Sequence, residues 1–149
     1  MTDIVLVHGT AVAIDGAAIL LRGAPGAGKS DLALRLIDCG ARLVADDQAE
    51  LRRTEDHIVV SAPTVIASLI EVRGLGILRV DAVAAAPLAL LVDLVPPAEI
   101  ERLPEGRCEE VLGLNVPVIA LAPFEASAPA KLRLACRAFP ARRLPAILS

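Results

Sequence analysis

The stretch that decides the fold of this chain is Gly23-Ala24-Pro25-Gly26-Ala27-Gly28-Lys29-Ser30. It fits the phosphate-binding loop G-x-x-x-x-G-K-[ST], in which glycines let the backbone curl so that successive N–H groups face a polyphosphate. In such a loop Lys29 reaches the β- and γ-phosphates, and the Ser30 hydroxyl ligates Mg²⁺. The eight residues therefore predict a site for ATP with Mg²⁺ beside it. The alternative for the same residues is a purely structural glycine-rich turn.

The flanking sequence supplies the strand and the helix that a phosphate-binding loop requires. Before the loop, the apolar runs 10–14 and 17–21 flank Asp15-Gly16, a dipeptide that favours a two-residue hairpin turn. After it, apolar residues recur at helical spacing from Ser30, and Gly40 is suited to the position that follows a helix. The loop is thus expected between a strand and a helix of about ten residues.

The rest of the chain continues the alternation of strands and helices. Further strands are predicted at 42–45, 88–95 and 116–121, with an edge hairpin of 49–53 and 57–61. Pro129 can begin a last helix, which carries Leu132, Ala135, Cys136 and Phe139. This order predicts an α/β fold, a P-loop NTPase-like sheet with helices on its faces, formed by residues 1–149 as a single domain.

A second chemical motif follows the predicted helix. The run Leu43-Val44-Ala45-Asp46-Asp47 is an apolar strand that delivers two acids at its carboxyl end, beside the P-loop in a parallel sheet. One carboxylate can hold the metal or its water, and the other can accept the proton of an attacking hydroxyl. The residues alone leave open which acid has which role.

The segment Glu71-Val72-Arg73-Gly74-Leu75-Gly76-Ile77 places opposite charges two residues apart beside two glycines. It could supply a metal-binding glutamate and a phosphate-facing arginine. An ordinary glycine loop with a surface ion pair is the alternative that chemistry alone leaves open.

Composition excludes several classes of function. With 149 residues, a net charge of −3 and only Phe124 and Phe139 as aromatics, the chain offers neither the basic surface nor the stacking platform that nucleic-acid binding needs. No targeting or membrane segment is visible, since the apolar run 82–92 is too short to cross a bilayer. Three widely spaced cysteines, expected to be buried and reduced, indicate a cytoplasmic protein rather than a disulfide frame or zinc site (Cys39, Cys108 and Cys136).

Three features in one order resemble the catalytic domain of the HPr kinase/phosphorylase family. They are Val7-His8-Gly9 before the P-loop, residues 43–47 after it, and the segment 71–80, whose E-x-R-G-x-G pattern is that family's signature. The resemblance implies a P-loop fold similar to the nucleotide-binding core of phosphoenolpyruvate carboxykinase. It also implies ATP-dependent phosphorylation of a serine in the phosphocarrier protein HPr, a homo-oligomer (a hexamer) and regulation of the sugar phosphotransferase system.

The same resemblance implies roles for individual residues. His8, Lys29, Asp47 and Arg73 would lie in the active site, with Asp47 as proton acceptor. Ser30, Asp46 and Glu71 would hold Mg²⁺. The separate N-terminal domain of full-length family members is not expected in this chain.

Two stretches depart from the family's pattern. Where the family has an aspartate-arginine pair, this sequence reads Glu109-Glu110-Val111, and Arg107 is the nearest substitute for the arginine. The family's basic Pro-Gly-Arg-Asn loop is replaced by residues 123–129. Kinase activity is therefore expected to exceed dephosphorylation by phosphorolysis.

Other P-loop functions remain as alternatives. A kinase for a small metabolite would use an arginine-rich lid, for which the only late basic cluster is Arg137, Arg142 and Arg143. A non-catalytic nucleotide sensor would keep Lys29 but would not need a second acid. A GTPase switch is disfavoured because Asn115, the only asparagine, lies in no N-K-x-D pattern.

Overall fold

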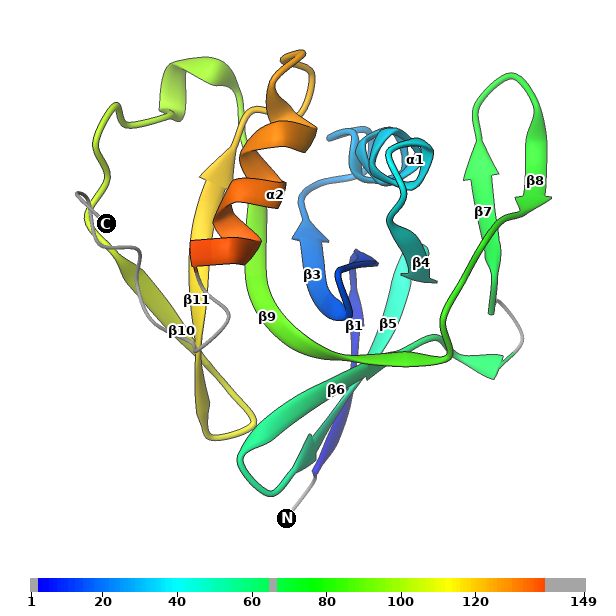
Figure 1. Ribbon diagram of the computed structural model, residues 1–149, viewed down its shortest axis with the longest axis horizontal. Coiled ribbons are helices and arrows are strands. Elements are labelled where there is room, and N and C mark those ends of the chain that lie inside the picture. Colours follow the sequence, from blue (N-terminus) through cyan, green and yellow to red (C-terminus); the bar gives the residue numbers. More distant parts are fainter. Residues whose placement is uncertain (1–2, 65–66, 139–149) are drawn as a thin grey trace.

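The computed structural model describes residues 3–64 and 67–138, which form a mixed α/β fold with a curled sheet (Figure 1). In chain order the elements are β1 (Ile4–His8), β2 (Thr10–Ile14), β3 (Ala17–Arg22), α1 (Lys29–Asp38), β4 (Arg42–Ala45), β5 (Gln48–Thr54), β6 (His57–Ser61), β7 (Leu69–Val72), β8 (Gly76–Arg79), β9 (Ala85–Leu94), the 3₁₀ turn η2 (Pro97–Glu99), β10 (Arg107–Val111), β11 (Leu114–Leu121) and α2 (Ala128–Ala138).

Strand β9 organises the main sheet. Its first residues pair antiparallel with β6, and its later residues pair parallel with β3 on one side and β11 on the other. The strand order is β1-β5-β6-β9-β3-β2-β4, with β11 and then β10 added beyond β9. Figure 1 shows β9 as a long bent ribbon that passes from β6 to the strands β3 and β11. Because β9 takes different partners along its length, the sheet curls.

Each face of the sheet packs against its own apolar core. Val12 and Ile14 of β2 face a core that includes Leu32 and Leu36 of α1 and Leu132 of α2. The alternate residues of β2 face the other core, which strands β5 and β6 complete with Ala49, Leu51, Ile58 and Val60. This alternation is the two-residue period of a strand buried on both sides.

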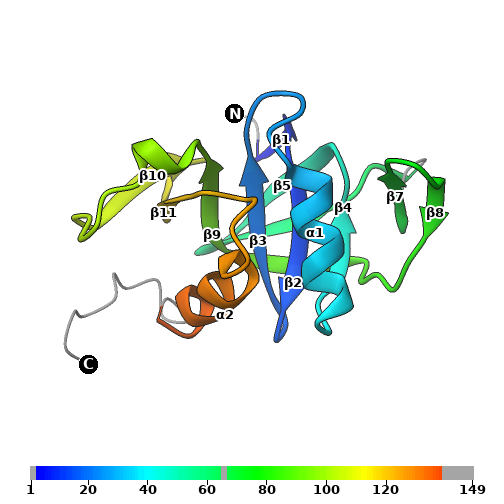
Figure 2. The same ribbon diagram turned by 90° about the horizontal axis from the view of Figure 1, so that it is seen from above.

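The placement of the helices differs from the expectation. Both helices lie on the same side of β2 and β3 (Figure 2), so only one face of the sheet is covered by helices. The curled β5–β6 half of the sheet covers the opposite face. Helices on both faces were predicted because apolar periodicity reports that a face is buried but not what buries it.

The local turns predicted around the P-loop are confirmed. Ile14 pairs with Ala17, and Asp15 and Gly16 both have positive φ, 51° and 83°, as a two-residue hairpin turn requires. At the end of α1, Gly40 has φ 103° and donates its N–H to Ile37, while Ala41 donates to Leu36. This is the Schellman arrangement that ends helices at glycine.

One predicted position in the sheet is wrong. The β5–β6 hairpin turns at Glu55-Asp56 but is not at an edge, because β1 pairs with β5 and β9 pairs with β6. Strand β4 does not lie beside β3, since β2 pairs with both. As both are antiparallel to β2, β3 and β4 run parallel, and their carboxyl ends reach the same edge of the sheet.

The cysteines are free but are not the buried residues that were expected. Cys39 and Cys108 are exposed, and Cys136 is half-buried. Burial raises the pKa of the Cys136 thiol to about 11, so this thiol stays protonated at neutral pH. None of the helices in the described part of the chain has the length and apolarity needed to cross a bilayer. Phe139, Arg142 and Arg143 lie outside the described residues.

Candidate functional site

The loop 23–28 joins β3 to α1 in the conformation that an anion site needs. Gly26 and Gly28 have φ of 82° and 102°, in a backbone region that residues other than glycine rarely adopt. Gly28 is the N-cap of α1, and it offers no side chain that could bond the first N–H groups of the helix. The N-terminal N–H groups of α1 therefore point outward without a side-chain cap, ready for a phosphate.

Lys29, the first residue of α1, reaches back to the start of the loop. Its Nζ donates to the backbone oxygen of Gly23 at 2.6 Å and to that of Ala24 at 3.2 Å. An ammonium group has three N–H donors, so one remains for a ligand in the loop. The positive charge of Lys29 is thus held at the mouth of the glycine turn.

Asp46 is the centre of the site. It is only 8% exposed, and its Oδ1 accepts hydrogen bonds from Ser30 Oγ at 2.7 Å and from Thr10 Oγ1 at 3.0 Å. Its Oδ2 accepts the backbone N–H of Glu71 at 3.0 Å. Asp46 therefore links the ends of β4 and β7 and the starts of β2 and α1, and it joins the P-loop to the glycine-rich hairpin.

Asp47, the next residue, is exposed to solvent. Its φ of 67° is left-handed, a conformation that aspartate tolerates better than most residues. Its backbone is fixed by bonds from Gly9 N to its oxygen at 3.0 Å and from its own N to Thr10 Oγ1 at 3.2 Å. His8, exposed at the end of β1, directly precedes Gly9. The structure thus brings His8 and Asp47 to the same edge of the sheet as the P-loop.

The segment of Glu71 and Arg73 forms the β7–β8 hairpin, which stands beside α1 and apart from the main sheet (Figures 1 and 2). Both side chains are exposed. In the described part of the chain, no ion pair joins Glu71 to Arg73, so the alternative of a loop with a surface ion pair is not supported. No hydrogen bond there joins the Arg73 guanidinium to the P-loop either.

The donor set fits a magnesium ion that shares its coordination with phosphate and water. Ser30 gives its proton to Asp46, so the lone pairs of its Oγ remain for a cation. Asp46 accepts three hydrogen bonds of about four that a carboxylate can take, which leaves room for a metal-bound water. No group of three His, Cys, Asp or Glu side chains among residues 3–64 and 67–138 forms a complete protein cage. Mg²⁺ does not need one, because it usually keeps several waters.

An ion network that was not predicted from the sequence lies at the same edge of the sheet. Arg22, directly before the P-loop, bonds Asp93 at 2.8 Å and Glu109 at 2.6 and 3.0 Å. Arg107 bonds the second oxygen of Asp93 at 3.0 Å. The hydrogen bonds between Arg22 and Glu109 lower the pKa of Glu109 below its ordinary value. The same bonds raise the pKa of Arg22 above its ordinary value. The available signal was one charge in each of two otherwise apolar strands, since Arg22 and Asp93 are partners in register.

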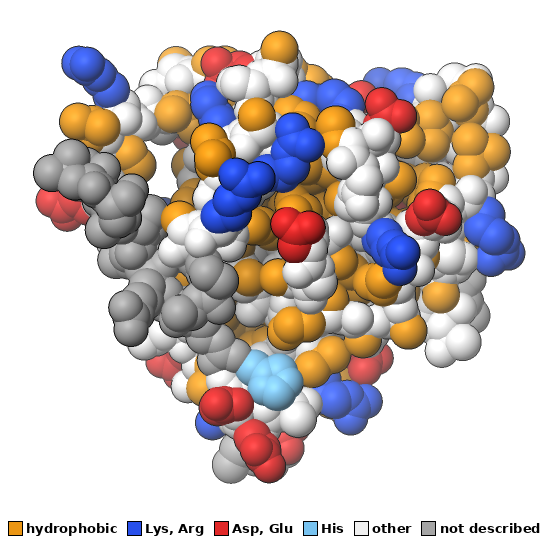
Figure 3. Space-filling model, in the orientation of Figure 1, with side chains coloured by type: hydrophobic (Ala, Val, Ile, Leu, Met, Phe, Trp, Pro, Cys, Tyr) orange, Lys and Arg blue, Asp and Glu red, His pale blue; other side chains and the backbone are white. Residues whose placement is uncertain are grey.

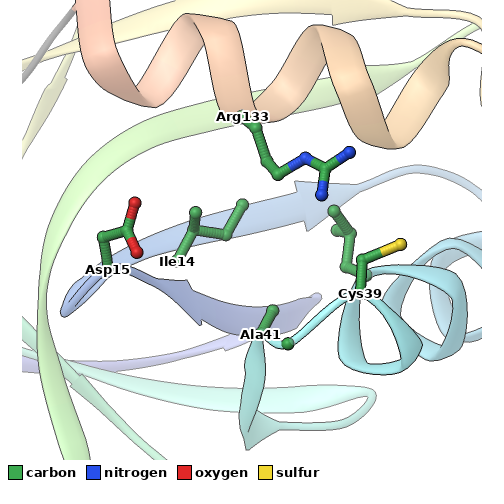
Figure 4. Close-up of a pocket in the computed structure, with 7 residues that line it drawn as sticks. Ile14, Asp15, Cys39, Ala41 and Arg133 are labelled. Carbon is green, nitrogen blue, oxygen red and sulfur yellow. The ribbon is translucent and has the colours of Figure 1, made fainter.

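A pocket lies at the carboxyl-terminal end of α1. This pocket of about 80 Å³ is lined by residues that include Asp15, Cys39 and Arg133 (Figure 4). It lies about 15 Å from the P-loop, the length of a ten-residue helix. The face in Figure 3 carries basic and acidic side chains interspersed with apolar ones. The loop 23–28 therefore lies at the opposite end of α1 from this pocket.

Replacing Asp46 with asparagine is expected to destabilise the fold. The NH₂ of the new amide would face one of the donors that now bond the carboxylate of Asp46. Two donors would then face each other at a nearly buried position, and neither would have an acceptor. The free energy of unfolding should fall by about 1–3 kcal/mol. Urea denaturation without nucleotide would measure this change. The matched control is Asp47→Asn, for which a change within about 0.5 kcal/mol is expected because this side chain is exposed; equal losses in both variants would contradict the central position of Asp46.

Comparison with known proteins supports one family. Residues 1–123 match the family model described as HPr Serine kinase C-terminal domain. The match thus extends well beyond residue 80, the end of the last of the three features that carry the resemblance in the sequence. The structure is similar to that of the Hpr(Ser) kinase/phosphatase from Coxiella burnetii, with a TM-score of 0.79, 30% identity and coverage of 89% of this chain and 93% of that chain.

Curated relatives point the same way. The chain is 43% identical over 113 residues to the HPr kinase/phosphorylase of Peptoclostridium acidaminophilum, covering 73% of this chain and 36% of the relative. It is 40% identical over 115 residues to that of Caldanaerobacter subterraneus subsp. tengcongensis, covering 74% and 37%. The chain therefore spans little more than a third of the length of these curated relatives.

Proposed function

This chain belongs to the HPr serine kinase C-terminal domain family, and we propose that it transfers the γ-phosphoryl group of ATP to a serine of HPr, in the regulation of the sugar phosphotransferase system and carbon metabolism. The observation that carries the proposal is the set of hydrogen bonds at Asp46. They join Ser30 of the P-loop to the backbone of Glu71 in the family's signature segment. A glycine turn with only a structural role would not require either contact.

The P-loop residues would hold the triphosphate of ATP. The backbone of 23–30 offers N–H groups, and Lys29 keeps one ammonium hydrogen for the phosphates. Ser30, Asp46 and Glu71 would hold Mg²⁺, Ser30 through its Oγ and Asp46 through a bound water. Mg²⁺, when bound, neutralises phosphate charge as it spreads in the transition state.

The exposed acid would act on the incoming serine. Asp47 accepts the proton of the attacking hydroxyl, because its carboxylate faces solvent, where a protein substrate must approach. His8 and Arg73, exposed at the same edge and on the adjacent hairpin, would assist at the reacting phosphate. These roles rest on the family's pattern and on the geometry of the two aspartates.

The proposal extends to the architecture and to the setting of the protein. We take the sheet to be P-loop NTPase-like, similar to the nucleotide-binding core of phosphoenolpyruvate carboxykinase, and residues 1–149 to form a single catalytic domain. A cytoplasmic homo-oligomer, a hexamer by family resemblance, is the expected state. The three free cysteines support a reducing compartment.

A direct assay tests the proposed activity. The purified chain is mixed with Mg²⁺, ATP and HPr, and the intact mass of HPr is followed together with the position of the phosphoryl group. One phosphoryl group on a serine is the expected product. ATP binding with no change in HPr would favour the nucleotide sensor, and phosphorylation of a small metabolite instead of HPr would favour the alternative kinase.

The reverse direction, phosphorolysis, is expected to be slower than the kinase reaction. That reaction must hold inorganic phosphate beside phosphoserine, and each close pair of like charges costs about 4 kcal/mol at an effective dielectric constant of about 20. Two arginines at this edge are already paired with carboxylates, since Arg107 bonds Asp93 and Arg22 bonds both Asp93 and Glu109. The rate should be at least about tenfold lower, which corresponds to ~1.4 kcal/mol of uncompensated repulsion.

Pyrophosphate release from serine-phosphorylated HPr and inorganic phosphate measures this reaction. The control is the forward rate with the same enzyme preparation and matched substrate concentrations. A phosphorolysis rate equal to the kinase rate would show that the departures at 109–111 and 123–129 are harmless.

A further inference from the structure

An exposed phenyl ring lies against the phosphate-binding loop. Phe124 follows β11 and is 70% exposed, yet its ring touches the backbone of Gly28. A Cβ at Gly28 would meet Cζ of this ring at 2.8 Å. The tip of the ring is thus in contact with the loop, whereas most of its surface faces solvent. Burial in the core therefore does not account for its position.

The segment that carries Phe124 is fixed to α1. Arg35 of α1 donates hydrogen bonds to the backbone oxygens of Pro123 and Glu125, one on each side of the phenylalanine. Ala128 N donates to Glu125 O at 3.1 Å, where α2 begins. The ring is therefore held beside the loop in advance of any ligand, which lowers the entropy that binding would lose.

The topology places this ring where a nucleotide extends beyond its phosphates. Strands β3 and β11 both run parallel to β9, so all three end at the same edge. In open α/β sheets, ligands bind beyond the carboxyl ends of the strands. A triphosphate seated in the loop after β3 leaves its base outside the loop, and the segment after β11 adjoins that loop at Gly28. An aromatic face is the natural partner for the π-face of a base.

We propose that Phe124 stacks on the base of the bound nucleotide and so contributes affinity that the phosphate contacts do not supply. This inference rests on the proposed ATP-binding function and names a further positioning residue for it. Phe124 follows directly on residue 123, the last residue that the family model matches. Stacking uses a feature common to all bases, so the contact strengthens binding more than it selects between bases.

Calorimetry with two ligands tests the proposal. Mg²⁺·ATP carries a base, whereas Mg²⁺·tripolyphosphate presents the same phosphates without one. In Phe124→Ala the affinity for ATP should fall by about 5- to 150-fold, as expected for one lost base–aromatic stack. The affinity for tripolyphosphate should stay within about twofold. The control is Leu134→Ala, which removes a similarly exposed apolar side chain, 61% exposed, from α2 and should change neither value.

The possible outcomes separate the proposals. Equal losses for both ligands would mean that the ring only supports the P-loop, and unchanged ATP binding would mean that it contacts no base; either result overturns the inference. If the wild-type chain bound neither ATP nor tripolyphosphate, the proposed function itself would be overturned. Circular dichroism of each variant establishes that it is folded.

A second variant gives a spectroscopic signal. The sequence contains no tryptophan and no tyrosine, so Phe124→Trp introduces the only strong fluorophore. This variant should keep ATP affinity within about threefold, because indole also stacks on bases. ATP should quench its emission and tripolyphosphate should not. Emission that responds equally to both ligands would contradict contact with the base.

Discussion

Replacing Lys29 with alanine is expected to reduce ATP-dependent transfer to HPr by at least about 100-fold. The reason is electrostatic, because in the proposed function the ammonium group of Lys29 stabilises the phosphates as charge spreads in the transition state. Its Nζ is anchored by the oxygens of Gly23 and Ala24, so the charge is in place before ATP binds. A fixed charge of this kind needs no reorganisation during the reaction.

Single-turnover rates with saturating Mg²⁺·ATP measure this effect. The matched control is Lys131→Ala, because Lys131 is the only other lysine and makes an exposed ion pair with Glu125 at 3.5 Å. Such pairs contribute about 0–1 kcal/mol, so near wild-type activity is expected there. Turnover close to that of the wild-type chain in Lys29→Ala would remove the basis for the P-loop assignment.

Local signals in the sequence predicted local structure well. The turn at Asp15-Gly16, helix α1 and its end at Gly40 depend on residues within a few positions of one another. What periodicity did not predict were the partners of each strand. The insertion of β2 between β3 and β4, and the curl that carries β5 and β6 across the second face, depend on pairing between distant segments.

The same distinction applies to the candidate site. The P-loop is contiguous, and the contact of Ser30 with Asp46 follows from two motifs separated by one helix. Thr10 gave no signal, because a threonine at the start of an apolar strand is ordinary β-sequence. Its hydroxyl nevertheless bonds both Asp46 and the backbone of Asp47. The position of Phe124 beside Gly28 could not be predicted, since it depends on Arg35 holding the segment after β11.

The two adjacent aspartates have opposite environments, and this difference gives the second large expected effect. Asp46 points inward to three donors, whereas Asp47 is exposed, with its backbone fixed by Thr10 and Gly9. Because Asp46 is nearly buried and both of its oxygens already accept hydrogen bonds, it is not placed to meet an incoming hydroxyl. The exposed neighbour is free to meet an incoming hydroxyl.

Asp47→Asn should therefore lower the single-turnover rate of phosphoryl transfer by about 10²- to 10⁴-fold, the range for loss of a general base. Affinity for Mg²⁺·ATP should stay within about twofold, since in the proposed function this side chain acts on the incoming serine and not on the nucleotide. Asparagine also tolerates the φ of 67°, so a folding defect is not expected to imitate the loss. Asp46→Asn is the matched comparison. This variant should bind Mg²⁺ more weakly and should also have a lower free energy of unfolding. If Mg²⁺ titrations and single-turnover rates give the reverse pattern, the buried acid is the base and the exposed one is on the metal side, which would require Ser30 to release Asp46 before each turnover.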